Sequence, residues 1–182
     1  MKDRTKPIYL DYNATTPIDP RVVEAIQPYL TTFFGNPSSS HWYGVQARKA
    51  VSEARRQVAE CIGAKPDEII FTSGGSESNN MAVKGVALSR KDRGRHIITS
   101  KVEHPAIIEV CRWLEENGFQ ITYLSVDSTG MVNPEDIAAA IRSDTILITI
   151  MLANNEVGTV QPLQKIALTA HEKGVLLHTD AA

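Results

Sequence analysis

The sequence predicts an α/β protein in which a largely parallel sheet carries helices on both faces. The first observation is an alternation, because short runs of β-branched residues take turns with longer segments of helical periodicity. The second is glycine just after helical segments, as at Gly118 and Gly174, where helices commonly end. Such an alternation favours parallel strands joined by right-handed helical crossovers, and so a three-layer arrangement.

The region before the alternation is predicted to be mainly helical. Residues 8–10 form a short strand-like piece. Asp19 then precedes Pro20, and proline is favoured at the first position of a helix. Small apolar residues at helical spacing indicate a second helix over about 44–61, which Gly63 would end.

The alternation itself supplies the expected sheet and its crossover helices. The β-branched runs are 69–72, 96–99, 120–126, 145–151 and 175–178. The helical segments between them are about 76–89, 106–117, 134–141 and 163–173. Their order predicts a βαβαβαβαβ chain.

Composition excludes several classes of protein. A net charge of −2 indicates no nucleic-acid partner and no anionic membrane surface. The longest apolar stretch, 145–153, is too short to span a bilayer, and the charged residues 1–6 do not form a secretory signal. Only Cys61 and Cys111 are present, which is consistent with a reducing compartment. We therefore expect a cytoplasmic protein.

Polar residues collect directly after four of the strand-like runs. The stretches are 73–80 (SGGSESNN), 103–105 (EHP), 154–156 (NNE) and 180–182 (DAA). The carboxyl ends of parallel strands share one edge of a sheet, and ligands bind in the crevice at that edge. We expect these four stretches to converge on one site.

The glycines at the start of the 76–89 helix favour an anionic ligand. Gly74 and Gly75 let the backbone approach a ligand, and the free N–H groups at a helix start attract phosphate. The pattern matches neither the dinucleotide fingerprint nor the P-loop. A tight turn with Ser76 as helix cap is the alternative.

Three other positions carry side chains of functional interest. His104 could stack on a planar ring or move protons, although a local capping role is an alternative. Asp180 ends an apolar strand, where a carboxylate needs a cation or hydrogen bonds. His178 could join these two in a metal site, but the sequence offers no compact ligand cluster, so we predict none. Asn155 lies in a segment that could be only a turn.

Taken together, these stretches resemble the cysteine desulfurases of the NifS/IscS type. This group belongs to the class-V aminotransferases among the fold-type I enzymes that use pyridoxal 5′-phosphate. The matching segments occur in the family's order: 9–17 (YLDYNATTP), 35–41 (GNPSSSH), 71–80 (FTSGGSESNN), 103–106 (EHPA), 154–162 (NNEVGTVQP) and 178–182 (HTDAA).

The resemblance implies a role for each matching residue. Gly75 and Ser76 correspond to the phosphate-binding turn, where family members often have Ala-Thr. His104 corresponds to the catalytic imidazole that stacks on the pyridine ring and helps move protons. Asp180 corresponds to the carboxylate that pairs with the ring nitrogen. The remaining positions are Ala182 against the other ring face, Asn155 at the cofactor's phenolic oxygen or the substrate carboxylate, and Asn13, Ala14, Thr15 and His41 at the mouth of the site.

The resemblance also implies an activity and partners. The family converts L-cysteine to alanine and passes the sulfur as a persulfide to an iron–sulfur scaffold protein or another acceptor, usually as a homodimer. Two alternatives stay open. One is a related class-V enzyme, such as a selenocysteine lyase or an aminotransferase. The other is a non-catalytic assembly fragment.

The expected domain organisation is that of the front of such an enzyme. Residues 1–15 would be an arm belonging with the small domain, and 16–182 the first part of the cofactor-binding large domain. The rest of the large domain and the small domain would lie beyond Ala182. The lysines are Lys2, Lys6, Lys49, Lys65, Lys84, Lys91, Lys101, Lys165 and Lys173. None lies in a Ser-x-His-Lys segment, and no cysteine lies on a suitable loop, so we expect the chain alone to be inactive.

Overall fold

The computed structural model describes residues 7–182, which form two compact units. The first unit ends at Phe71, and the second is Thr72–Ala182. Residues 1–6, which belong to the predicted arm, lie outside the described residues. Within the described part of the chain, no helix is long and apolar enough to cross a membrane.

The first unit is built on two helices, as predicted. Helix α1 is Pro20–Thr31, and the Asp19 carboxylate accepts a 2.8 Å hydrogen bond from the Arg21 amide at its start. Helix α2 is Trp42–Ile62, followed by the short 3₁₀ helix η1 (Pro66–Glu68). Gly63 adopts a left-handed conformation with φ of 68° and so ends α2 where the sequence indicated.

Two strand predictions in this region are wrong. Residues 8–10 and 69–72 pair with no strand among the described residues. Ile69 is extended, but its carbonyl accepts a hydrogen bond from the Arg55 guanidinium instead of a strand amide. The Arg55 guanidinium also lies 4.9 Å from the centre of the Phe71 ring. A β-branched run provides the propensity for a strand, but a strand also needs a hydrogen-bonding neighbour.

The second unit contains the parallel sheet. Its strands are β1 (His96–Ser100), β2 (Gln120–Leu124), β3 (Thr145–Thr149) and β4 (Leu176–His178). They are arranged in the order β2-β1-β3-β4, and every neighbouring pair is parallel. The sequence therefore predicted the class and direction of the sheet correctly.

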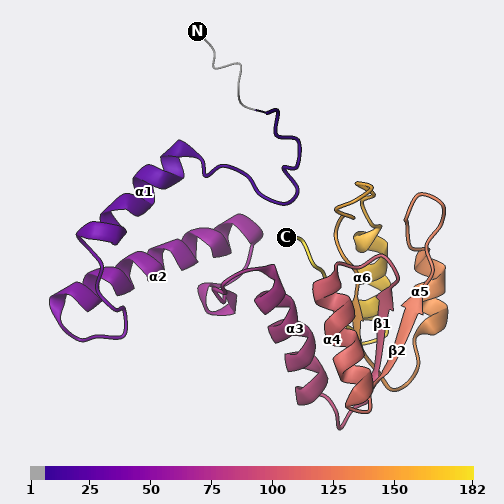
Figure 1. Cartoon of the computed structure of the whole chain (residues 1–182). Coiled ribbons are helices and arrows are strands. Elements are labelled where there is room, and N and C mark those ends of the chain that lie inside the picture. Colours follow the sequence, from indigo (N-terminus) through magenta and orange to yellow (C-terminus); the bar gives the residue numbers. More distant parts are fainter. Residues whose placement is uncertain (1–6) are drawn as a thin grey trace. The chain divides into compact units, whose positions relative to one another are not determined.

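Four helices form the outer layers of the second unit (Figure 1). They are α3 (Gly75–Ser89), α4 (Pro105–Glu116), α5 (Pro134–Ala140) and α6 (Leu163–Glu172). At the start of α5, the Asn133 side chain accepts a 3.1 Å hydrogen bond from the Glu135 amide. Each helix follows the periodic segment that predicted it within about two residues.

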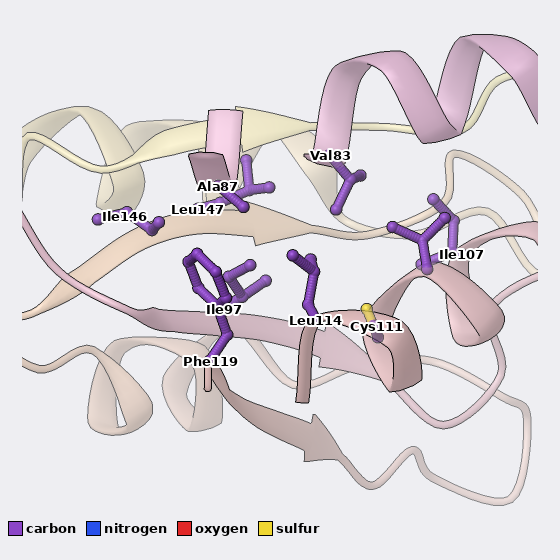
Figure 2. Close-up of a cluster of buried hydrophobic side chains, with 10 residues drawn as sticks. Val83, Ala87, Ile97, Ile107, Cys111, Leu114, Phe119, Ile146 and Leu147 are labelled. Atoms are coloured by element: carbon purple, nitrogen blue, oxygen red, sulfur yellow. The ribbon is translucent and has the colours of Figure 1, made fainter. Parts of the chain in front are cut away.

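The central strands β1 and β3 bury both of their faces, which gives the three layers. Ile97 packs with residues of α3 and α4, while the next residue, Ile98, packs with residues of α5 and α6. Figure 2 shows the first of these clusters, with Val83 and Ala87 from α3 and Leu114 from α4 around the strands. Successive side chains of a strand point to opposite faces, so an apolar run places a core on each side.

Candidate functional site

The carboxyl ends of β1, β3 and β4 meet at one edge of the sheet. The loop after β1 carries His104, the loop after β3 carries Asn155, and the segment after β4 carries Asp180. The pairing of β3 with β4 continues past the ends of both strands: the Leu152 amide donates a 2.8 Å hydrogen bond to the Asp180 carbonyl. Parallel topology therefore brings these loops to the edge that the sequence predicted.

The start of α3 reaches this edge as well. A β-carbon added to Gly75 would lie 3.3 Å from the β-carbon of Ala182, a tighter approach than most side chains accept. Gly74 offers no side-chain cap, and the amides of Gly75 and Ser76 have no acceptor within residues 7–182. Two unpaired amides at the positive end of a 15-residue helix favour an anionic group there.

Asp180 is held by two hydrogen-bond donors. The Asn79 side-chain amide donates to its Oδ2 at 2.8 Å, and the Ala182 backbone amide donates to its Oδ1 at 3.0 Å. Asp180 is half-buried, whereas Asn79 is only 3% exposed. The two donors fix the carboxylate's orientation.

His104 is the N-cap of α4. Its Nδ1 accepts a 3.1 Å hydrogen bond from the Ala106 amide, so the neutral ring carries its proton on Nε2. The ring is exposed and, together with Ser76, lines a cavity of about 670 Å³ at the surface of α3 and α4. His104 therefore caps the helix, which is the alternative that the sequence raised. The cap uses Nδ1 and leaves the Nε2–H available to a ligand.

Asn155 and the residues predicted at the mouth of the site take part in local contacts. The Asn155 side chain is exposed, and its amide donates to Glu156 Oε1 at 3.3 Å. Asn13, Ala14, Thr15 and His41 belong to the first unit.

Local contacts explain those four positions within their own unit. The amides of Ala14 and Thr15 both donate to the Asp11 carbonyl, so the 11–15 segment forms a turn. The Thr15 hydroxyl lies 2.7 Å from the Tyr9 hydroxyl. His41 caps α2, because its Nδ1 accepts from the Gly44 amide at 3.3 Å.

Comparison with known proteins places the chain in a family. Residues 8–182 match the sequence model described as aminotransferase class-V. The chain belongs to the aminotransferase class-V family. Within that family it is similar to the cysteine desulfurases of the IscS/NifS type.

The curated relatives are considerably longer than this chain. Cysteine desulfurase IscS of Dictyoglomus turgidum is 58% identical over 174 residues, which cover 96% of this chain and 44% of that protein. The IscS of Methanosarcina thermophila is 52% identical over 181 residues, covering 100% of this chain and 45% of that protein. The chain thus spans less than half the length of these relatives.

Solved structures show the same fold. A NifS-like protein superposes with a TM-score of 0.93 at 41% identity, covering 96% of this chain and 48% of that one. A structure described as SspA in complex with cysteine superposes with a TM-score of 0.92 at 44% identity, covering 96% of this chain and 50% of that one.

Class-V aminotransferases use pyridoxal 5′-phosphate, and the donor set at this edge fits that cofactor. The unpaired amides of Gly75 and Ser76 suit a phosphate. The carboxylate of Asp180, held by two donors, suits a protonated ring nitrogen. The imidazole of His104 offers a flat face and a free nitrogen. Within residues 7–182, no group of three His, Cys, Asp or Glu side chains is placed to hold a metal ion together.

Sequence reasoning gave no role to three buried polar residues at this edge of the sheet. Asn79 holds Asp180, Glu103 accepts the Met151 amide at 3.1 Å, and Asn154 donates to the Val102 carbonyl at 3.0 Å. A signal for Asn79 was present, because it lies three residues after Ser76 on the same helix and so shares its face. Nothing local in the sequence indicates the other two contacts, which join loops about 50 residues apart.

Proposed function

We propose that this chain is the cofactor-binding front of a pyridoxal-phosphate-dependent cysteine desulfurase. The observation that carries the proposal is the carboxylate of Asp180, which Asn79 holds at the same sheet edge where α3 begins with unpaired amides. Similarity to proteins named cysteine desulfurase supports the choice of substrate, as does the solved relative described as a complex with cysteine.

Each residue would have a distinct task. Gly75 and Ser76 would bind the phosphate, Asp180 would keep the ring nitrogen protonated, and His104 would lie against the ring. A protonated ring in such a site draws electrons from the carbon next to the substrate amine. Because its Nδ1 accepts from the Ala106 amide, His104 would present the Nε2–H of its neutral ring there as a hydrogen-bond donor. Ala182 would border the opposite ring face, and Asn155 would bind a cofactor or substrate oxygen.

The sulfur chemistry would need groups from outside this chain. Cys111 is buried, and burial raises the pKa of its thiol to about 12, which makes it a poor nucleophile. Lys101 donates to the Ser125 hydroxyl at 3.1 Å, and Lys84 lies 4.5 Å from the centre of the Trp113 ring. We propose that the lysine that holds the cofactor and the cysteine that accepts sulfur come from the remainder of the enzyme. The chain alone would then be inactive.

The cellular setting follows from the same assignment. The proposed substrate is L-cysteine, the products are alanine and a persulfide, and the sulfur acceptor is an iron–sulfur scaffold or another thiol protein. We propose a cytoplasmic homodimer, with Asn13, Ala14, Thr15 and His41 near the mouth of the complete site.

A chimera tests this proposal directly. The matching 174 residues of the Dictyoglomus turgidum enzyme are replaced by the corresponding residues of this chain, and alanine released from L-cysteine is measured. We expect cofactor absorbance and alanine production. Asp180→Asn should reduce turnover by about 100-fold, because the amide cannot balance the ring's positive charge.

The matched control is Asp144→Asn, a carboxylate just before β3 that pairs with Arg142 on the exposed surface. Its turnover should stay within about twofold, since exposed pairs contribute little. A chimera that binds the cofactor but only transfers amino groups would indicate the aminotransferase alternative. One that folds and binds no cofactor would refute the proposal.

A further inference from the structure

Glu103 is a buried carboxyl at the end of β1 for which the proposed chemistry has no task. Its side chain is among the buried polar groups, at 7% exposure. Oε1 accepts a 2.7 Å hydrogen bond from the Ser100 hydroxyl and a 3.1 Å hydrogen bond from the Met151 amide. Oε2 is buried and has no hydrogen-bond partner among the described residues.

The contacts of Glu103 join two loops of the candidate site. Ser100 ends β1, and Met151 lies two residues past β3, so one oxygen atom bonds to both strand ends. A second tie runs beside it, since the Asn154 side chain donates to the Val102 carbonyl at 3.0 Å. The residue after Glu103 is His104, whose ring begins α4.

We propose that Glu103 is a positioning residue, which fastens the loop that carries His104 to the end of β3 through its own side chain. This proposal deepens the proposed function. It rests on that function only where it takes His104 and Asp180 to be residues of the cofactor site. The fastening itself is a property of this chain without cofactor or substrate.

The protonation state of Glu103 follows from its surroundings. No Lys or Arg within residues 7–182 forms an ion pair with it, and an unpaired buried charge is costly. Burial, and secondarily the negative charge of Asp180, raise the pKa of Glu103 to about 7, against the lowering effect of its two donors. The charge of Glu103 contributes to the raised pKa of Cys111 in α4, after burial. Burial lowers the pKa of His178 in β4, and the charge of Asp180 opposes that lowering.

A neutral Glu103 has a close chemical mimic in glutamine. Glutamine keeps the carbonyl oxygen that Ser100 and Met151 use, and it places an NH₂ group where the acid has its hydroxyl. Alanine removes the acceptor from both donors. The pair Glu103→Gln and Glu103→Ala therefore separates the fastening from the ability to ionise.

The first measurement is hydrogen exchange at the Met151 amide in the 182-residue chain at pH 6. Glu103→Ala should speed exchange about tenfold relative to the wild type, since one buried hydrogen bond is lost, whereas Glu103→Gln should stay within about threefold. The NMR signals of the His104 ring should move in Glu103→Ala and not in Glu103→Gln. The control Glu116→Gln, an exposed carboxyl at the end of α4, the helix that His104 caps, should change neither.

The second measurement does not require the alanine variant to fold. The folded-state pKa of Glu103 lies above its ordinary value of 4.5, so the folded chain holds a proton that the unfolded chain has lost between about pH 4.5 and pH 7. Wild-type stability should therefore fall relative to Glu103→Gln across this window and run parallel to it above pH 7. Urea unfolding midpoints at several pH values give this comparison.

Two results would overturn the proposal. One is wild-type exchange at Met151 and an unchanged His104 ring in a folded Glu103→Ala chain. The other is an unfolding profile of Glu103→Gln that keeps the wild-type dependence on pH. Neither readout uses cofactor or cysteine, so failure here is distinct from failure of the proposed function.

Discussion

The side-chain amide of Asn79 donates a 2.8 Å hydrogen bond to the carboxylate of Asp180, a residue 101 positions later in the chain. Asn79 lies in the first half of α3, and Asp180 follows β4. The bond links the helix that would bind a phosphate to the segment that would bind a ring nitrogen. The bond therefore sets the distance between the two parts of the site that would hold the two ends of the proposed cofactor.

Replacing Asn79 should weaken the fold and shift its dependence on pH. Asn79→Ala leaves a half-buried carboxylate with one donor fewer, which costs about 1–3 kcal/mol in the free energy of unfolding. Asn79→Asp should cost more at neutral pH, because two carboxylates would face each other. That excess should shrink as the pH falls below about 5, when one of them takes up a proton.

Urea unfolding of these two variants measures the effect. Asn80→Ala is the control, because the Asn80 side chain donates to the Ser76 carbonyl within its own helix at 2.9 Å. It should change stability by about 0.5 kcal/mol or less. Equal losses in Asn79→Ala and Asn80→Ala would contradict a special role for Asn79.

Larger residues should be tolerated at one glycine of α3 and harmful at another. Apart from the backbone of its own helix turn, no atom of residues 7–182 lies within 4 Å of a β-carbon at Gly85, so Gly85→Ala should stabilise the chain by about 0.5–1 kcal/mol through helix propensity alone. Gly75→Val should bring its side chain against Ala182, whose β-carbon would lie 3.3 Å from the new β-carbon. We expect it to weaken binding of pyridoxal phosphate to the chimera.

The comparison of Gly75→Ala with Gly75→Val makes this prediction specific. A single methyl group requires a shift of only a few tenths of an ångström, so Gly75→Ala should retain the cofactor. Absorbance titration of each chimera with pyridoxal phosphate is the measurement. Full binding by Gly75→Val would show that the close approach to Ala182 is unimportant.

His96 should make the chain less stable in acid. Its ring lies in β1 between the hydroxyls of Thr145 at 2.7 Å and Thr122 at 2.8 Å. Burial, followed by the charge of Arg142, lowers the pKa of His96 below its ordinary value of 6.5. Because the unfolded chain takes up this proton first, the contribution of His96 to stability is present above pH 6.5 and is lost as the pH falls below it.

NMR titration of the His96 ring tests this directly, and the apparent pKa should lie below 6.5. The unfolding midpoints of His96→Gln should depend less on pH below about 6.5 than those of the parent chain. Using the Glu103→Gln background removes the opposite trend of that carboxyl. A ring pKa above 6.5 would contradict the prediction.

The two cysteines should differ in reactivity. Cys61 is exposed, whereas Cys111 belongs to the buried cluster around α4, where burial raises its pKa to about 12. A thiol reagent at pH 8 should modify one thiol rapidly and the second only as the chain unfolds. Cys61→Ser should abolish the rapid phase, and rapid labelling of Cys111 in that variant would contradict the assigned core.

The local signals of the sequence were sufficient for the helices and for the class of fold. Pro20 indicated a helix start because its ring fixes φ near the helical value, and Gly63 indicated a helix end because glycine readily adopts a left-handed backbone. Both are properties of a single residue. Buried strands such as β1 and β3 were evident as β-branched runs. The same signal was wrong at 69–72, where the propensity exists but no neighbouring strand is present to pair with it.

The sequence by itself determined a parallel sheet, the edge at which ligands would bind, and the chemical kinds of residue found there. Only the tertiary structure decided which of them touch: Asn79 holds Asp180, Gly75 approaches Ala182, and Glu103 joins two strand ends. The physical reason is distance along the chain. Periodicity and capping act over a few residues, whereas a hydrogen bond between positions 48 or 101 residues apart depends on how the layers pack.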